Sequence, residues 1–298
     1  MQFKHCRLEF DGPVATLVLD HPEVMNAVSP DMLAGLTEAM DAIDEKRDDI
    51  RCLVLTGAGK AFCTGANLQG RNDQSGKRPS AGTTLETAFH PFLRRLRNLH
   101  CPIISSVNGP AAGAGMSFAL MGDVIVCARS SYFLQAFRRI GLVPDCGSTW
   151  ILPRLIGKAR SVELSLLGER LPAEKALEWG LVNRVVDDAA LAEETRKLAH
   201  DLANGPTVAL SLIRRLYWES ENNSFEEQLD LEQQSSALPD AAKISRKASA
   251  RSWKSARPSS RAADLSAQRR CSRQTGCAGK QRSLFAAAGT CGISHFAQ

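Results

Sequence analysis

The sequence has no long hydrophobic run. No stretch approaches the roughly 18–20 apolar residues that a bilayer-spanning helix needs, and the N-terminal segment lacks the apolar core of a secretory signal. The nine cysteines are scattered and form no C-x-x-C pair. This pattern supports neither a zinc site nor a disulfide framework, and it favours free thiols in a reducing compartment. We therefore expect a cytoplasmic protein with no metal and no membrane association.

Several catalytic and cofactor-binding motifs are absent as well. The stretch GAGK (57–60) is not a phosphate-binding P-loop, because Val54 stands where that motif requires a glycine. The segment NGPAAGAGMS (108–117) does not match the dinucleotide fingerprint G-x-G-x-x-G. No G-x-S-x-G elbow and no H-x-x-x-H pair occurs. These absences argue against a P-loop nucleotidase, a Rossmann dehydrogenase, a serine hydrolase and a histidine-ligated metal enzyme.

Charge is divided unevenly along the chain. Residues 241–298 contain 12 lysines and arginines and one acid, Asp264, whereas residues 1–240 contain 25 basic and 31 acidic residues. The formal net charge of +5 therefore reflects this tail, so we expect no nucleic-acid partner for the folded part. The tail has few large apolar side chains, and we expect it to be disordered. Its composition resembles an out-of-frame translation of a GC-rich gene.

What the sequence does contain is an alternation of short β-branched runs with amphipathic helical patterns. Ser29 followed by Pro30 predicts a helix start, because serine caps helices and proline suits the first turn. From about residue 158 the pattern is helical. The alternation predicts an α/β layer architecture. The predicted strands are 14–19, 51–56, 102–107, 123–128 and 132–137, and the further predicted helices are 89–99, 171–182, 191–204, 207–221 and 224–238.

Two loops built from small residues follow predicted strands. In GAGKAFCTGANL (57–68), Gly65 lets the backbone approach a ligand, so that the N–H of Ala66 points into a site. In the segment 108–117, Ala114 and Gly115 stand where a helix begins, and its unpaired N–H groups favour an anion or a developing oxyanion. The alternatives are a tight strand-to-helix turn for the first loop and close packing of helices through small residues for the second.

A third loop, RIGLVPDCGSTW (139–150), places one carboxylate between an apolar run and a small-residue turn. One interpretation makes Asp145 the N-cap of the following helix. The other makes it a catalytic acid/base at a pocket wall, a role worth about 10²–10⁴-fold in rate. The two roles are compatible. Cys63 and Cys146 lie in these loops without a nearby histidine, so buried, unreactive thiols are the favoured interpretation.

Five segments carry a recognisable pattern by their sequence, order and spacing. They are HPEVMNAVS (21–29), GKAFCTGANL (59–68), VNGPAAGAGMSFALMGD (107–123), GLVPDCGSTWILPRLIG (141–157) and ALEWGLVNRVV (176–186). Together they resemble the crotonase (enoyl-CoA hydratase/isomerase) superfamily over about residues 8–240. The resemblance implies an α/β fold, a crotonase-like spiral of ββα units, with a helical C-terminal region that builds homotrimers or homohexamers. It also implies an acyl-CoA thioester substrate, with coenzyme A as part of that substrate and no separate cofactor.

The resemblance assigns roles to residues of all three loops. It places the two oxyanion-binding N–H groups on Ala66 and Ala114. Family hydratases carry two glutamates at the positions of Ser117 and Phe137 here, so hydration is disfavoured. Asp145 stands where a subset of the family's isomerases carries its acid, and the sequence around it is especially similar to the isomerases of phenylacetate catabolism, which act on a ring-epoxide CoA ester. We therefore predict double-bond isomerisation, with a hydratase and a non-catalytic acyl-CoA-binding subunit as alternatives.

Other positions carry binding roles only through this resemblance. Phe137 implies an apolar acyl pocket suited to an aromatic or fatty acyl group. The resemblance divides the chain into a spiral core with the acyl-CoA site (1–190), a helical oligomerisation region (191–240) and the tail (241–298). The implied substrate-binding residues are Val24, Met25 and Ala27 on the pantetheine and adenine side, Gly65, Asn67 and Leu68 beside the first oxyanion donor, Gly113 and Gly115 beside the second, and Pro144 beside the acid.

Overall fold

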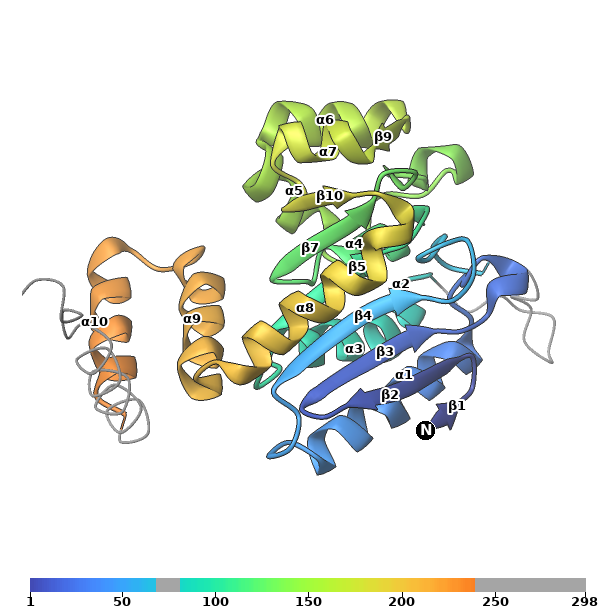
Figure 1. Ribbon diagram of the computed structural model, residues 1–298. Coiled ribbons are helices and arrows are strands. Elements are labelled where there is room, and N and C mark those ends of the chain that lie inside the picture. Colours follow the sequence, from blue (N-terminus) through green and yellow to red (C-terminus); the bar gives the residue numbers. More distant parts are fainter. Residues whose placement is uncertain (68–80, 239–298) are drawn as a thin grey trace, which may run out of the picture. The chain divides into compact units, whose positions relative to one another are not determined.

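Seven strands form one mixed sheet in the order β1-β2-β3-β4-β5-β7-β10 (Figure 1). The first three strands pair antiparallel, and from β3 onward every pairing is parallel. This computed structural model describes residues 1–67 and 81–238. The strands of the sheet are β1 (Gln2–Phe3), β2 (Cys6–Asp11), β3 (Val14–Leu19), β4 (Cys52–Gly57), β5 (Ile103–Val107), β7 (Val124–Ala128) and β10 (Arg184–Val186).

A small second sheet lies next to the second of the small-residue loops. Its order is β6-β8-β9, with β6 (Ala111–Ala112) parallel to β8 (Tyr132–Leu134) and β8 antiparallel to β9 (Arg170–Pro172). The predicted strand 132–137 therefore ends three residues early, because Phe137 already belongs to a 3-10 turn, η3 (Phe137–Ile140). This early turn carries Phe137 away from the sheet edge and, as shown below, into a cavity wall.

Side-chain caps mark the first residues of two helices, α1 and α10. Ser29 caps α1, since its side chain accepts a hydrogen bond from the N–H of Met32. Ser224 and Glu227 form a reciprocal capping box at the start of α10. The helices are α1 (Pro30–Glu45), α2 (Ala81–Thr84), α3 (His90–Arg97), α4 (Ala114–Ala119), α5 (Ser148–Ile156), α6 (Lys158–Leu167), α7 (Ala173–Trp179), α8 (Leu191–Asn204), α9 (Thr207–Ser220) and α10 (Phe225–Ser236), with further turns η1 (Pro22–Val24), η2 (Leu85–Phe89) and η4 (Asp188–Ala190).

Helices cover both faces of the large sheet. One face packs on α8, whose buried Leu191, Ala199 and Ala203 contact side chains of β3, β4, β5 and β7. The other face packs on α1 and α3, and this larger core also takes in α4. In Figure 1, α8 runs across the sheet on the side opposite α1 and α3. Because strands buried on both faces read as continuous apolar runs, β4 and β7 are recognisable in the sequence without alternation.

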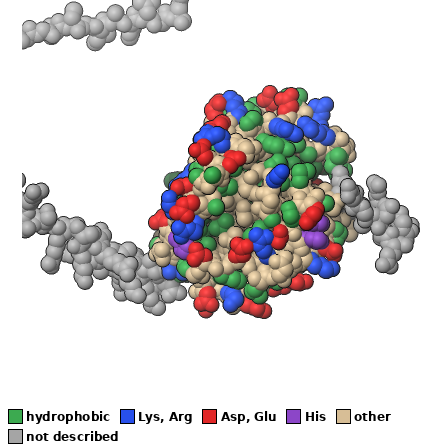
Figure 2. Space-filling view, turned by 45° about the vertical axis from the view of Figure 1, so that its right-hand side comes forward, with side chains coloured by type: hydrophobic (Ala, Val, Ile, Leu, Met, Phe, Trp, Pro, Cys, Tyr) green, Lys and Arg blue, Asp and Glu red, His purple; other side chains and the backbone are tan. Residues whose placement is uncertain are grey.

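Exposed apolar side chains concentrate on the helices outside this core. Leu166 is 66% exposed on α6, and Tyr217 and Phe225 are 76% and 74% exposed on α9 and α10. Figure 2 shows hydrophobic side chains gathered among charged ones, most densely in the upper part of the face that it presents. Within the described ranges every helix is too short or too polar to cross a membrane. Leu68 and the tail 241–298 lie outside the described residues.

Candidate active site

The three small-residue loops meet at one cavity. It has a volume of about 130 Å³ and is lined by Ala66 from the first loop, Ala114 from the second and Asp145 from the third. These residues come from segments up to 79 positions apart in the sequence. The cavity therefore brings together the three positions that the sequence singled out for chemistry.

Hydrogen bonds to the neighbouring segment determine where the N–H of Ala66 points. Val28 donates to the carbonyl of Gly65 at 2.7 Å, and Asn67 donates to the carbonyl of Val28 at 2.8 Å, so Ala66 pairs with Val28 as in a parallel sheet. In this pairing Gly65 and Asn67, the two neighbours of Ala66, make the hydrogen bonds to Val28. The N–H of Ala66 therefore points away from Val28. Among the described residues this amide donates to no other group. It is therefore available on the cavity side.

Ala114 presents its amide for a different reason. It is the first residue of α4, where a backbone N–H has no acceptor within the helix. The preceding Gly113 has φ +52° and Gly65 has φ +94°, conformations that glycine adopts most readily. A Cβ on Gly65 would lie 2.9 Å from the carbonyl oxygen of Ala112 and 3.5 Å from the nitrogen of Ala114. The two donor loops can approach this closely only because Gly65 has no side chain.

Asp145 is half-buried, and its backbone shapes the entrance to α5. Its carbonyl accepts from Ser148 through both the backbone N–H at 3.1 Å and the Oγ at 2.9 Å. The N-cap of α5 is Gly147, and the helix has no side-chain cap. The interpretation of Asp145 as a side-chain cap is therefore wrong, because two left-handed residues, Cys146 at φ +53° and Gly147 at φ +81°, separate it from the helix. Its side chain lines the cavity instead.

The buried surroundings of the two loop cysteines, Cys63 and Cys146, make their thiols unreactive. Cys63 is fully buried, and burial raises the pKa of its thiol to about 12. Burial also raises the pKa of the Cys146 thiol, and the neighbouring Asp145 carboxylate raises it further. Because only the thiolate is a strong nucleophile, neither residue is suited to covalent catalysis. This agrees with the sequence interpretation. Nowhere in the described part of the chain do three metal-ligating side chains gather.

Ser117 and Phe137, at which the sequence resemblance expects glutamates in a hydratase, have different surroundings. Ser117 is fully buried, and its Oγ donates to the carbonyl of Asp145 at 3.4 Å. Phe137 is 5% exposed and lines the cavity. Further apolar lining comes from Leu85, Phe89, Ile140 and Leu142. The cavity thus has one carboxylate, a pair of backbone donors and mostly hydrophobic walls.

Of the remaining predicted substrate-binding residues, two line this cavity and the others that the structure describes lie outside its wall. Gly65 and Gly113 line it, whereas Gly115 packs against Cys63, where a Cβ would lie 2.1 Å from the carbonyl oxygen. The absence of a side chain at Gly115 thus allows α4 to lie close to the backbone of the first loop, a loop contact and not the packing of two helices. Pro144 lines a separate groove of about 390 Å³ beside α5 and α6. The three residues Val24, Met25 and Ala27 follow or end η1, and the carbonyl of Met25 accepts from the N–H of Thr64 at 3.2 Å.

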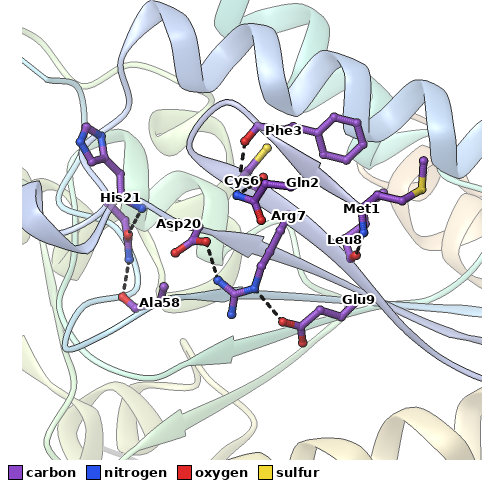
Figure 3. Close-up of polar contacts among 11 residues, drawn as sticks. Met1, Gln2, Phe3, Cys6, Arg7, Leu8, Glu9, Asp20, His21 and Ala58 are labelled. Carbon is purple, nitrogen blue, oxygen red and sulfur yellow. Dashed lines mark hydrogen bonds and ion pairs between the residues drawn. The ribbon is translucent and has the colours of Figure 1, made fainter.

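Asn26 is a positioning residue that the sequence did not single out. It is fully buried with φ +56°, a backbone conformation that asparagine tolerates better than most residues. Its Oδ1 accepts from the N–H of His21 at 2.9 Å, and its Nδ2 donates to the carbonyls of Ala58 and Ala61 at 2.9 and 2.8 Å. Figure 3 shows His21 and Ala58 on either side of these contacts. Asn26 thereby ties the segment that precedes α1 to the loop that carries Ala66.

Comparison with known proteins identifies the family of this chain. The sequence profile described as Enoyl-CoA hydratase/isomerase matches residues 9–257. The chain is 48% identical over 220 residues to the 1,2-epoxyphenylacetyl-CoA isomerase of Escherichia coli (strain K12), which covers 74% of this chain and 84% of that protein. It is 38% identical over 232 residues to a probable enoyl-CoA hydratase of Rhodobacter capsulatus, covering 78% of this chain and 88% of that protein.

Solved structures show the same fold. An enoyl-CoA hydratase subunit from Geobacillus kaustophilus superimposes with a TM-score of 0.78 at 32% identity, over 87% of this chain and 98% of that one. A hydratase structure from Streptomyces coelicolor gives a TM-score of 0.79 at 28% identity, over 86% and 94% of the two chains. The predicted crotonase fold is thereby confirmed. Sequence, fold and the placement of the three loops together show that this chain belongs to the enoyl-CoA hydratase/isomerase family and is an enzyme of acyl-CoA thioesters.

Proposed function

We propose that this protein isomerises an acyl-CoA thioester, with Asp145 as the single acid/base and the amides of Ala66 and Ala114 as the oxyanion hole. The observation that carries the proposal is the convergence of these three residues on one cavity of about 130 Å³. Two backbone donors next to one carboxylate suit a reaction in which a proton leaves and returns while charge develops on a carbonyl oxygen.

The reaction proceeds in two proton transfers. The Asp145 carboxylate removes a proton from C2 of a 3-enoyl-CoA, and the electron pair of that C–H bond moves through the thioester to give a dienolate. The N–H groups of Ala66 and Ala114 hold the negative oxygen, each donor being worth roughly 3–4 kcal/mol. The protonated carboxyl then returns the proton to C4, and the double bond forms between C2 and C3. One carboxyl group suffices, because the same proton leaves and returns.

Hydration requires more than this site offers. Adding water across a double bond calls for a group that activates the water as well as one that moves a proton, and a carboxylate serves this purpose at neutral pH. Ser117 and Phe137 stand at the two glutamate positions, and Phe137 lines the cavity with an apolar ring. The hydratase alternative is therefore the weaker one. The 48% identity to an isomerase favours the same choice.

The test follows conversion of a 3-enoyl-CoA to the conjugated 2-enoyl-CoA by wild type and by Asp145→Asn. We expect the variant to lose at least about 10²-fold in kcat, as expected for a positioned acid/base, while its affinity for a saturated acyl-CoA stays within threefold. Asp48→Asn, at an exposed position outside the cavity, serves as a control for replacement of an aspartate. Binding without isomerisation in the wild type would instead favour the acyl-CoA-binding subunit.

The acyl group is proposed from the same relative. The E. coli protein is named as an isomerase of 1,2-epoxyphenylacetyl-CoA, and we include a ring-epoxide CoA ester as the second substrate to assay. The pantetheine and adenine of CoA are assigned to the segment with Val24, Met25 and Ala27, which adjoins the donor loop through Thr64. Substitution of Met25, which is 53% exposed, by aspartate then raises KM with little change in kcat.

The helical region is proposed to assemble homotrimers or homohexamers. Tyr217 and Phe225 expose large apolar surfaces on α9 and α10, and exposed apolar patches of this kind mark protein interfaces. Light scattering coupled to size-exclusion chromatography measures the assembly directly. A monomeric mass at micromolar concentration would contradict this part of the proposal. The division into a core over 1–190 and an oligomerisation region over 191–240 stays a prediction, and because α8 packs on the large sheet we assign the proposed subunit contacts to α9 and α10.

A further inference from the structure

The cavity has a closed end and an open mouth. Phe89 and Phe137 line it and are only 4% and 5% exposed. Ile140 and Leu142 line it too, but they are 47% and 37% exposed. Because the two phenylalanines are inaccessible from outside, they form the inner wall. The two aliphatic residues lie where solvent reaches the cavity.

Phe89 packs against a second phenylalanine ring. The centroid of its ring lies 6.1 Å from that of Phe118, and the Phe92 ring lies 5.1 Å from Phe118 in an edge-to-face arrangement. Phe118 is fully buried on α4, the helix that also carries Ala114. Displacing the Phe89 ring inward would therefore disturb the helix that presents an oxyanion donor. The inner wall is consequently a rigid one.

The π-helical turn η2 brings Phe89 to this position. Residues Leu85 to Phe89 form the turn between α2 and α3, and Thr84, Leu85 and Phe89 all line the cavity. A π turn places one extra residue in the helix and shifts the side chains that follow it, and such turns are common at functional sites. Here the shift directs two apolar side chains from one short turn to the cavity wall.

The cavity volume sets the size of the group that fits. An engineered protein cavity of about 150 Å³ lined by Leu, Ile and Phe stays dry and binds one benzene molecule. The present cavity has about 130 Å³, and Leu85, Phe89, Phe137, Ile140 and Leu142 supply most of its apolar wall. It therefore has room for a group of about the size of one six-membered ring. A long straight acyl chain exceeds this volume unless the inner wall gives way.

We infer that Phe89 and Phe137 close the acyl end of the site and restrict the acyl group to about the size of one six-membered ring, with Phe89 as a specificity-determining residue. This inference rests on the proposed function, because it takes the cavity as the place where the acyl group binds. It goes further by choosing ring-sized acyl groups over long fatty ones and by naming the residue that makes the choice.

Binding of unreactive ligands tests the size limit separately from catalysis. Calorimetry of phenylacetyl-CoA and of dodecanoyl-CoA with the wild type is expected to give at least tenfold tighter binding of phenylacetyl-CoA. Phe89→Ala removes the inner wall and is expected to reduce this preference at least tenfold by improving the binding of dodecanoyl-CoA. Phe89→Leu, a milder change, shifts the preference in the same direction by a smaller factor.

Phe92→Ala is the matched control. Phe92 belongs to the same aromatic cluster and is fully buried, but it does not line the cavity. It is expected to lower thermal stability while leaving the ratio of the two affinities within threefold of wild type. Equal affinity of the wild type for both ligands, or equal shifts in Phe89→Ala and Phe92→Ala, would overturn the inference.

The size limit and the isomerase proposal fail in different ways. If the affinity ratios behave as expected but no 3-enoyl-CoA is isomerised, the site binds ring-sized acyl groups and the reaction is wrong. If isomerisation proceeds equally well with short and long chains and depends on Asp145, the reaction stands and the size limit is overturned. Absence of binding by both ligands would overturn both.

Discussion

Arg214 on α9 donates from Nε to Oδ2 of Asp123 at 2.5 Å, in a pair whose side chains are only 5% and 22% exposed. The same guanidinium donates to the carbonyls of Leu96 and Leu99 at 3.0 and 2.8 Å, and Asp123 also accepts from the N–H of Ile103. Burial raises the pKa of the Asp123 carboxyl, and the guanidinium opposes that rise. Arg214 thus connects α9 to the end of α3, and through Asp123 it connects α9 to the start of β5.

Removal of this guanidinium is expected to be costly. Arg214→Met removes the cationic partner of the Asp123 carboxylate and a donor to the carbonyls of Leu96, Arg97 and Leu99, and breaking a buried pair in this way costs about 3–5 kcal/mol. Denaturant unfolding monitored by tryptophan fluorescence measures the loss. The double variant Arg214→Met/Asp123→Asn is expected to lose clearly less than the sum of the two single changes, because it leaves no buried charge unpaired. Additive losses would show that the two residues act independently.

The hydrogen bonds of Asn26 give a second prediction. Asn26→Ala removes the donors to Ala58 and Ala61 and the acceptor for His21, and each buried group left unsatisfied costs about 1–3 kcal/mol. We expect a loss of at least about 2 kcal/mol in unfolding free energy, because several groups around the fully buried side chain lose their partner at once. Since Asn26 positions the loop of Ala66, kcat is expected to fall as well. Asn222→Ala, at an exposed position, changes neither quantity appreciably.

The oxyanion donor on Ala114 can be removed without rebuilding the helix. Proline is tolerated at the first position of a helix, where its missing N–H has no intrahelical partner. Ala114→Pro is therefore expected to lower kcat for isomerisation about 10²–10³-fold, the effect of losing one such donor. Ala114→Gly retains the N–H and is expected to stay within tenfold of wild type. Similar kcat values for the proline and glycine variants would argue against an oxyanion role for this amide.

His100 gives a prediction about pH. It is 8% exposed, its Nε2 lies 3.0 Å from the carbonyl oxygen of Ile50, and burial lowers the pKa of its imidazole. Between that lowered pKa and about 6.5, the unfolded chain binds a proton that the folded chain does not. The contribution of His100 to stability is therefore present above about pH 6.5 and is lost as the pH falls through the folded-state pKa.

The measurement compares urea unfolding at pH 7 and pH 5. We expect the wild type to lose stability over this interval and His100→Gln to lose less, because glutamine carries no proton to gain and its amide can still donate to Ile50. His200→Gln changes a partly exposed imidazole on α8 that pairs with Asp11, and it is the control for histidine replacement as such. An unchanged pH dependence in His100→Gln would locate the acid sensitivity in other groups.

Elements with a strong local pattern could be predicted from sequence. The runs that became β4 and β7 contain four or more consecutive apolar residues, and α1 and α10 show helical patterns that begin at side-chain caps. The short strands β6, β9 and β10 have two or three residues each and carry no periodic signal. They exist because neighbouring strands supply their partners, and sequence periodicity does not contain that information.

The functional site likewise contains residues that local sequence patterns reveal and residues that they do not. Gly65 and Gly113 could be recognised from small-residue loops, and Asp145 from an isolated acid after an apolar run. Asn26 could not, because its importance lies in three partners from other segments. Phe89 could not either, since an ordinary amphipathic pattern gives no sign that a π turn directs its ring to a cavity.

The sequence by itself determined the family resemblance, the layered α/β class and the three loops, because caps, glycines and hydrophobic periodicity act over a few neighbouring residues. Only the tertiary structure decided that Ala66, Ala114 and Asp145 share one cavity and that Asp145 does not cap α5. It also decided that two buried phenylalanines end that cavity. These relationships depend on the packing of distant segments against one another, and a local pattern does not specify that packing.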